Sequence, residues 1–124
     1  MSPSQTRLLF KSGAIFNVLA GLPFLLAPGP MTALMGFELN PVALMFSQIV
    51  FGMIVAFGWA YWMIARDPVR YRPFILLGLA LKIMVAAVVY GHWLAGNISW
   101  QLPTLAFGDI VFALLFWEYY QRTA

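Results

Sequence analysis

Lys82 and Asp109 are the residues whose type and position could support chemistry, because each lies inside a long apolar stretch and far from its ends. A charged side chain at the centre of a bilayer costs at least about 2.5–3.5 kcal/mol on insertion scales, so it is usually paired or faces a cavity. A lysine and an aspartate placed together could carry a proton, anchor a polar headgroup or act as acid and base. They could equally form a structural clamp whose desolvation cost cancels most of its attraction.

Two uncharged polar residues, Asn17 and Gln48, lie in the two earlier apolar stretches. Each of the four stretches carries one polar residue inside a row of mostly small residues with helical spacing. The rows are Gly13, Asn17 and Gly21; Gln48, Gly52, Ala56 and Ala60; Gly78, Lys82 and Ala86; and Ala106, Asp109 and Ala113. Small residues at this spacing let helices approach closely in lipid, so we expect these rows to be the faces where helices meet. Asn17 and Gln48 would at least serve as polar contacts between packed helices.

The depth of the four polar residues in the membrane predicts whether they meet. With a rise of 1.5 Å per residue, Gln48 and Asp109 lie roughly 9–10 Å from the outer boundary, and Asn17 and Lys82 roughly 15–18 Å. Helical side chains lean toward their own N-terminus, which tilts Lys82 and Asp109 apart, so a direct pair and a link through Asn17, Gln48 or water both stay open. We predict that all four residues form one polar core.

The composition predicts an integral membrane protein. Hydrophobic residues make up 63% of the chain and charged residues 9%, whereas soluble domains carry roughly 25% charged residues. Pro28-Gly29-Pro30 and Arg66-Asp67-Pro68 separate apolar spans over residues 8–27, 42–65, 74–94 and 104–120. Each span has close to the ~20 residues that a helix needs to cross a bilayer, and open strands would leave backbone groups unpaired in lipid. We therefore expect an all-α, single-domain, four-helix bundle over residues 1–124.

The basic residues predict how these spans are oriented. Outside the spans or at their ends lie Arg7, Lys11, Arg66, Arg70, Arg72 and Arg122. All six fall on one side of the predicted membrane, while residues 28–41 and 95–103 on the other side contain no Lys or Arg. The positive-inside rule then puts both termini in the cytoplasm and the chain in the inner membrane. With no other basic surface, a nucleic-acid partner is not expected.

Aromatic residues gather near both predicted membrane boundaries. Near the inner boundary lie Trp59, Tyr61, Trp62, Tyr71, Trp117, Tyr119 and Tyr120, and near the outer one Tyr90, Trp93 and Trp100. Tyr and Trp are enriched at membrane interfaces because their rings are amphipathic. We interpret these residues as interfacial anchors.

The residues that usually hold cofactors are scarce. His92 is the only histidine and there is no cysteine, so neither a bis-histidine haem nor a zinc or copper site is expected. Gly29 and Gly36 are interpreted as loop breakers, because the pattern of a phosphate-binding loop does not surround them. We predict no cofactor, no metal and no catalytic motif, and leave open whether the chain is an enzyme.

Four features of the sequence occur together. They are the run GAIFNVLAG over residues 13–21, the Arg66-Asp67-Pro68 exit from the second span, Lys82 inside the third, and Gly108-Asp109 opening an aromatic-rich last helix. In these features the chain resembles the small four-helix bacterial membrane proteins grouped around the DoxX-like family. The resemblance implies a four-helix bundle, and members of that group are accessory subunits of quinone-linked oxidoreductases, assembly factors or uncharacterised proteins. It transfers no catalytic residue to this chain.

Three hypotheses of function follow. The first is an accessory or interaction subunit of a quinone-linked or other membrane complex, because the chain is short and its loops are brief. The second is a small-molecule-binding, lipid-binding or proton-coupled transport unit that uses Lys82, Asp109, Asn17 and Gln48 as its site. The third is a membrane enzyme with Asp109 and Lys82 as acid and base. The expected partners are the lipid bilayer, further copies of the chain or a larger complex, and a hydrophobic small molecule.

Overall fold

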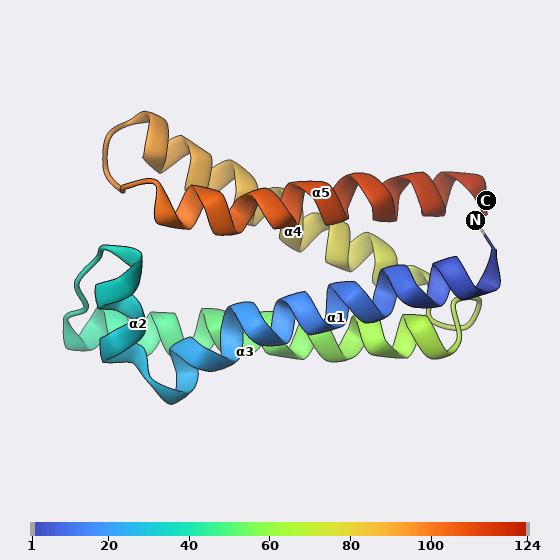
Figure 1. The fold of residues 1–124 in the computed structure, drawn as a ribbon, viewed down its shortest axis with the longest axis horizontal. Helices are drawn as coiled ribbons and strands as arrows, with labels where there is room; N and C mark the ends of the chain where they lie inside the picture. Colours follow the sequence, from blue (N-terminus) through green and yellow to red (C-terminus); the bar gives the residue numbers. More distant parts are fainter. Residues whose placement is uncertain (1, 124) are drawn as a thin grey trace.

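A computed structural model describes residues 2–123, which are entirely helical apart from short connections. The helices are α1 (Pro3–Leu26), α2 (Pro28–Met35), α3 (Pro41–Arg66), α4 (Arg72–Leu94) and α5 (Gln101–Arg122) (Figure 1). The described residues contain no strand. The all-α prediction is therefore confirmed.

Proline and capping residues determine where the helices begin. Prolines lie in the first turn of every helix, where the missing backbone N–H has no helical partner to lose. Ser2 and Gln5 form a capping box at α1, and the Asn40 side chain accepts a hydrogen bond from the Ala43 backbone N–H at α3 (2.8 Å). Beyond α4 the chain turns at Gly96, whose φ of 81° favours glycine.

The segment after α1 differs from the prediction. We expected Pro28-Gly29-Pro30 to open a loop, but the chain bends at Ala27 and starts α2 at once. Gly29 lies in the first turn of α2, so its interpretation as a loop breaker was wrong. Gly36 does end α2, with a left-handed φ of 82°.

The four long helices form two antiparallel pairs. Helix α1 packs mainly on α3 and α4 mainly on α5, while smaller contacts join α3 to α4 and α1 to α5. Both chain ends lie at one end of the molecule, called here the terminal end, and α2 lies at the other, called the α2 end (Figure 1). The space between the pairs is therefore bounded by all four long helices.

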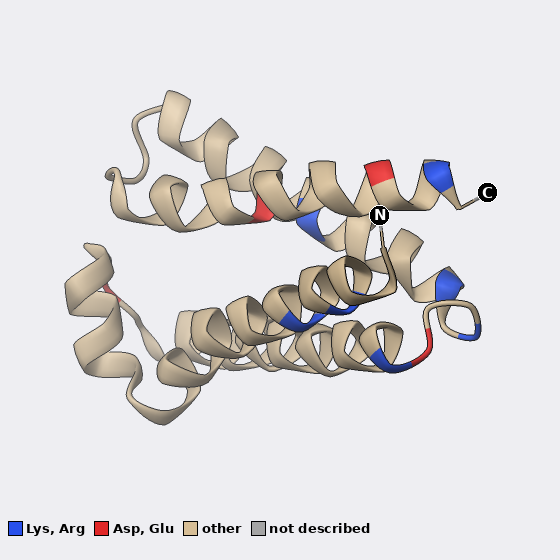
Figure 2. Ribbon diagram, turned by 45° about the vertical axis from the view of Figure 1, so that its right-hand side comes forward, with Lys and Arg blue, Asp and Glu red and all other residues tan. Residues whose placement is uncertain are grey.

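The four long helices are long and apolar enough to cross a membrane, which fits a small multi-pass membrane protein. Their outward faces carry large apolar side chains such as Leu19, Ile83 and Leu114. In Figure 2 most of the Lys and Arg positions, coloured blue on the ribbon, lie toward the terminal end. This distribution matches the predicted pattern, and the side of the membrane on which the termini lie stays a prediction.

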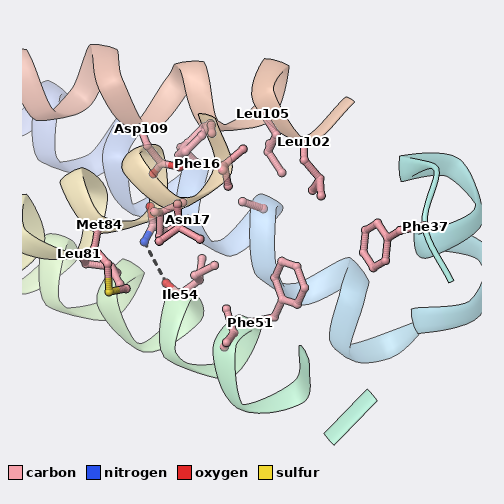
Figure 3. A pocket seen from close by; sticks show the side chains of 16 residues that line it. Phe16, Asn17, Phe37, Phe51, Ile54, Leu81, Met84, Leu102, Leu105 and Asp109 are labelled. Carbon is pink, nitrogen blue, oxygen red and sulfur yellow. Dashed lines mark hydrogen bonds between the residues drawn. The ribbon is translucent and has the colours of Figure 1, made fainter. Parts of the chain in front are cut away.

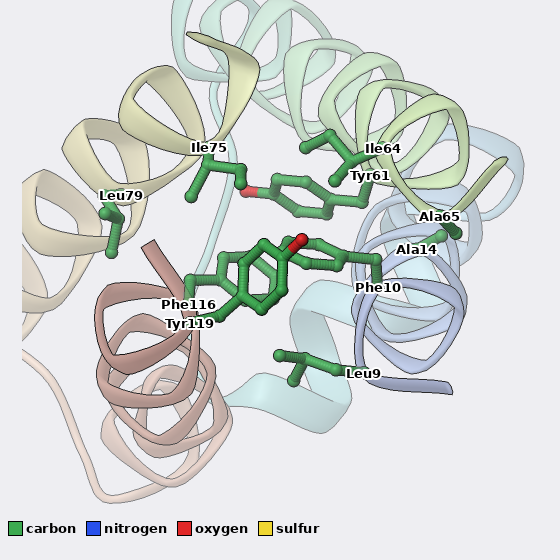
Figure 4. Close-up of a cluster of buried hydrophobic side chains, with 10 residues drawn as sticks. All are labelled: Leu9, Phe10, Ala14, Tyr61, Ile64, Ala65, Ile75, Leu79, Phe116 and Tyr119. Atoms are coloured by element: carbon green, nitrogen blue, oxygen red, sulfur yellow. The ribbon is translucent and has the colours of Figure 1, made fainter. Parts of the chain in front are cut away.

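The terminal half of the space between the pairs is filled by a packed core (Figure 4). The Phe116 ring stacks on Phe10 at 4.7 Å between centroids and meets the edge of Tyr61 at 5.1 Å. Tyr61 is fully buried and Tyr119 is 8% exposed, so they are core residues and not the interfacial anchors we expected. Trp59 is 69% exposed, as an anchor would be.

Candidate functional site

Lys82 of α4 and Asp109 of α5 form a direct ion pair midway along the two helices. The Lys82 Nζ atom lies 2.9 Å from Asp109 Oδ1 and also donates a hydrogen bond to Asn17 Oδ1 on α1 at 3.1 Å. The lysine stem is long enough to overcome the opposite lean of the two side chains. Of the alternatives that the sequence left open, the direct pair is the one present.

Asn17 extends this network to the fourth long helix. Its Nδ2 atom donates a hydrogen bond to the backbone carbonyl of Ile54 on α3 at 2.9 Å, drawn as the dashed line in Figure 3. The side chain of Asn17 is only 2% exposed. Three side chains thus connect α1, α3, α4 and α5, and the nitrogen and the oxygen of the Asn17 amide each make one hydrogen bond.

Gln48 does not join the polar core. It is exposed on α3, six residues before Ile54, where the network reaches this helix. At about 100° per residue, six residues correspond to a rotation of roughly 240°, so the two positions face different directions. The prediction of Gln48 as a core residue was wrong, because a shared depth does not fix a shared face.

Four aromatic rings surround the ammonium group of Lys82. The centroids of Phe16, Tyr61, Phe112 and Phe116 lie 5.2, 5.2, 5.5 and 5.9 Å from Nζ. Ring faces attract a cation, by about 2 kcal/mol or more per ring when water is excluded. These rings and the two oxygen acceptors offset part of the cost of burying Lys82, whose side chain is 1% exposed.

Glycines on three helices leave room for three of these rings. A Cβ atom would lie 2.9 Å from the Phe116 ring at Gly13, 2.5 Å from the Tyr61 ring at Gly78, and 2.6 Å from the Phe16 ring at Gly108. Each ring therefore occupies space that a side chain would otherwise fill. This arrangement was not predicted from the sequence, although the aromatic residues and glycines inside the spans were a usable signal.

The predicted contact rows are correct on α1 and α4 and wrong on α3. A Cβ atom at Gly21 would lie 2.7 Å from the Phe51 carbonyl oxygen, so α1 and α3 approach closely there. At Gly52 nothing lies within 4 Å, and Ala56 of the same row is exposed. Gly58, which we did not select, makes the contact instead, because its Cβ position lies 3.1 Å from the Ala14 carbonyl oxygen.

An apolar cavity of about 350 Å³ lies between the pairs, on the α2 side of the polar network. Asp109 and Asn17 line one end, and Phe37 lies at the other (Figure 3). The remaining lining residues are all apolar: Phe16, Ala20, Val50, Phe51, Ile54, Leu81, Met84, Val85, Val88, Val89, Leu102, Leu105 and Ala106. The space between the pairs is thus solid in its terminal half and hollow in its α2 half.

The lining of the cavity includes side chains of α3 and α4 that are exposed at the outer surface of the molecule. Three of its lining residues are about half exposed: Val50 on α3 at 47%, and Met84 and Val88 on α4 at 54% and 55%. In a membrane this surface meets lipid tails. An apolar molecule could therefore enter sideways from the bilayer.

The two charged partners differ in their access to this cavity. The Asp109 side chain is 17% exposed and lines the cavity, whereas the Lys82 side chain is 1% exposed and does not. Among the described residues no hydrogen bond uses Asp109 Oδ2. A carboxylate oxygen thus remains accessible at the polar end of an apolar cavity.

His92, Glu118 and Arg122 lie apart from this site. His92 is exposed and its Nδ1 atom lies 2.9 Å from Asn97 Nδ2. Glu118 pairs with Arg122 at 2.7 Å on the exposed surface of α5. Within residues 2–123, no three His, Cys, Asp or Glu side chains cluster to hold a metal ion.

Comparisons of the chain with family models, curated proteins and solved structures find no match. The resemblance to the DoxX-like group therefore stays a prediction. What the fold and composition define is a class: a small multi-pass membrane protein with four apolar helices. Its function has to be argued from the cavity and the polar residues at its end.

Proposed function

We propose that this protein binds an apolar small molecule or lipid in the cavity between its two helix pairs, with Asp109 as the polar contact. The observation that carries the proposal is the unequal exposure of the ion pair, because only Asp109 faces the cavity. An ion pair that only stabilised helix packing would not need to expose a carboxylate to the cavity. Ligand sites have this composition, an apolar lining with few polar groups.

The size of the cavity supports the same proposal. At about 350 Å³ it falls near the lower end of the roughly 300–1,000 Å³ of small-molecule sites. A long-chain molecule would place its polar end beside Asp109 and leave the rest of its chain between α3 and α4, toward the lipid. The stacked rings of Phe24 and Phe51, 4.1 Å apart, support the wall at the α2 end.

The other hypotheses of function have less support from residue contacts. An accessory subunit was favoured by chain length and loop size, and it would coexist with ligand binding. The acid–base hypothesis needs both ionised groups at the substrate, but Lys82 is sealed behind aromatic rings. We therefore place binding first and keep the accessory role as a second property to be tested by co-purification.

We also propose an inner-membrane location with both termini in the cytoplasm. The support is the basic residues at the terminal end, since the positive-inside rule concerns short loops and span ends. In this orientation the cavity lies in the outer half of the membrane. Its ligand would then come from the outer leaflet.

The proposal is tested by filling the cavity. Ala106 is 3% exposed and lines the cavity, so Ala106→Phe would occupy ligand space. Ala56→Phe is the matched control, because Ala56 is an exposed residue of α3 outside the cavity. Native mass spectrometry of the protein released from gently solubilised membranes should show a retained molecule in the wild type and in Ala56→Phe, but not in Ala106→Phe. Equal retention by all three proteins would contradict the proposal.

A further inference from the structure

If the proposed function is right, the hydrogen-bond donors and acceptors that line the cavity limit which ligands it can hold. Only two polar side chains line the cavity, Asn17 and Asp109. The Asn17 carbonyl oxygen accepts from Lys82 and one of its two amide N–H groups donates to Ile54. The second N–H belongs to a side chain that is only 2% exposed, so Asn17 offers almost no donor surface to the cavity. The remaining polar capacity is that of the Asp109 carboxylate, which can only accept hydrogen bonds. A ligand that brings only acceptors, such as an ether or a ketone, finds no exposed donor there.

The charge balance of the cavity adds a second limit. Asp109 is already neutralised by Lys82 at 2.9 Å, so the polar end of the cavity has no net charge. A cationic ligand would leave one uncompensated positive charge in an apolar surrounding, which is strongly unfavourable. An anionic ligand would meet the exposed carboxylate, while the lysine that could pair with it is sealed. Both kinds of ionised headgroup are therefore excluded.

We propose that the ligand is an uncharged amphiphile whose headgroup carries a hydroxyl group, and that this hydroxyl donates a hydrogen bond to Asp109. Its apolar part fills the cavity and leaves between α3 and α4. Lys82 then acts as a positioning residue that fixes and neutralises the carboxylate without touching the ligand. The pair selects for a donor and against charge at the same position.

The test uses a matched series of four amphiphiles with the same alkyl chain, added at low mole fraction to the protein in lipid nanodiscs. They are the long-chain alcohol, its methyl ether, the alkylguanidinium and the alkyl sulfate. The ether lacks the donor, the guanidinium carries donors with a permanent positive charge, and the sulfate carries a permanent negative charge. Binding is followed by nuclear magnetic resonance of isotope-labelled methionine methyl groups. Met84 lines the cavity, and Met53, exposed on α3 outside it, reports unspecific partitioning.

The alcohol should shift the Met84 signal in a saturable way and leave the Met53 signal unchanged. The ether and both ionic probes should need about tenfold higher concentration or more, as expected for the loss of a hydrogen bond to a charged group. If the ether or an ionic probe binds as well as the alcohol, this inference is overturned and the proposed function stands. If no probe shifts Met84 in a saturable way, the proposed function itself fails.

A double variant checks that Asp109 is the acceptor. Lys82→Met with Asp109→Asn keeps the site uncharged and replaces the carboxylate by an amide, which can donate as well as accept. The preference for the alcohol over the ether should then shrink toward equality. An unchanged preference in the folded double variant would show that another group selects the ligand and would overturn the inference. If the double variant does not fold, the four-probe series on the wild type decides alone.

Discussion

The ion pair of Lys82 and Asp109 allows a quantitative prediction from a double-mutant cycle. The single changes are Lys82→Met and Asp109→Leu, and each leaves one charge without its partner in an apolar surrounding. Removing one member of a buried pair costs roughly 3–5 kcal/mol, whereas replacing both by apolar residues is often close to neutral. The double variant should therefore recover most of the stability that either single variant loses.

The structure predicts that the two single variants are unequal. In Lys82→Met the remaining Asp109 side chain is 17% exposed and lines the cavity, so we expect a loss near the lower limit, about 3 kcal/mol. In Asp109→Leu the remaining Lys82 side chain is 1% exposed, so we expect a loss nearer about 5 kcal/mol. The hydrogen bond to Asn17 and the surrounding rings still stabilise the ammonium group and reduce this loss. The coupling energy between the two positions should be at least about 3 kcal/mol.

The assay is unfolding in mixed micelles by a denaturing detergent, followed by circular dichroism. Glu118 and Arg122 provide the control cycle, because their charged atoms lie only 2.7 Å apart but both side chains are about half exposed or more. An exposed pair of this spacing on a helix contributes about 0.3–0.5 kcal/mol. A Lys82–Asp109 coupling no larger than that of the control would refute the interpretation of a sealed pair.

Two further predictions concern helix packing and orientation. Gly21→Ala should destabilise the protein by about 1–3 kcal/mol, because the new methyl group meets the Phe51 carbonyl oxygen. Gly52→Ala should be neutral or slightly stabilising, because nothing lies within 4 Å of the new methyl group. Equal melting temperatures of the two variants would mean that the close approach of α1 and α3 is absent. A reporter active only in the cytoplasm should give signal when fused to the C-terminus and none when inserted after Asn97, and the reverse pattern would overturn the orientation.

Charges inside apolar stretches made much of the polar core predictable. Lys82 and Asp109 are costly in lipid, so their presence alone predicted a partner or a cavity, and the structure provides both. Asn17 could be predicted as a core residue because it lies between Gly13 and Gly21 at helical spacing. Gln48 was a wrong choice because α3 carries small residues on several faces, and the sequence gives no criterion for choosing the face that meets α1.

The cavity and the aromatic surround of Lys82 were not predictable from the sequence. The cavity depends on how far the two helix pairs separate at the α2 end, which helical periodicity does not determine. Tyr61 was assigned to the interface from its position along the chain, whereas its burial depends on Gly78 of another helix. Helix α2 was missed because Pro28 and Pro30 were interpreted as breakers, although prolines also suit the first turn of a helix.

The central claim is that the hollow half of the bundle holds a ligand, and the mass of the protein released from its own membrane tests it most directly. The wild type should carry one defined molecule per chain that survives gentle detergent exchange. Ala106→Phe should lower its occupancy about tenfold or more, as steric exclusion implies, while Ala56→Phe should retain it. An undefined mixture of bulk lipids on all three proteins, with no difference at Ala106→Phe, would contradict the claim.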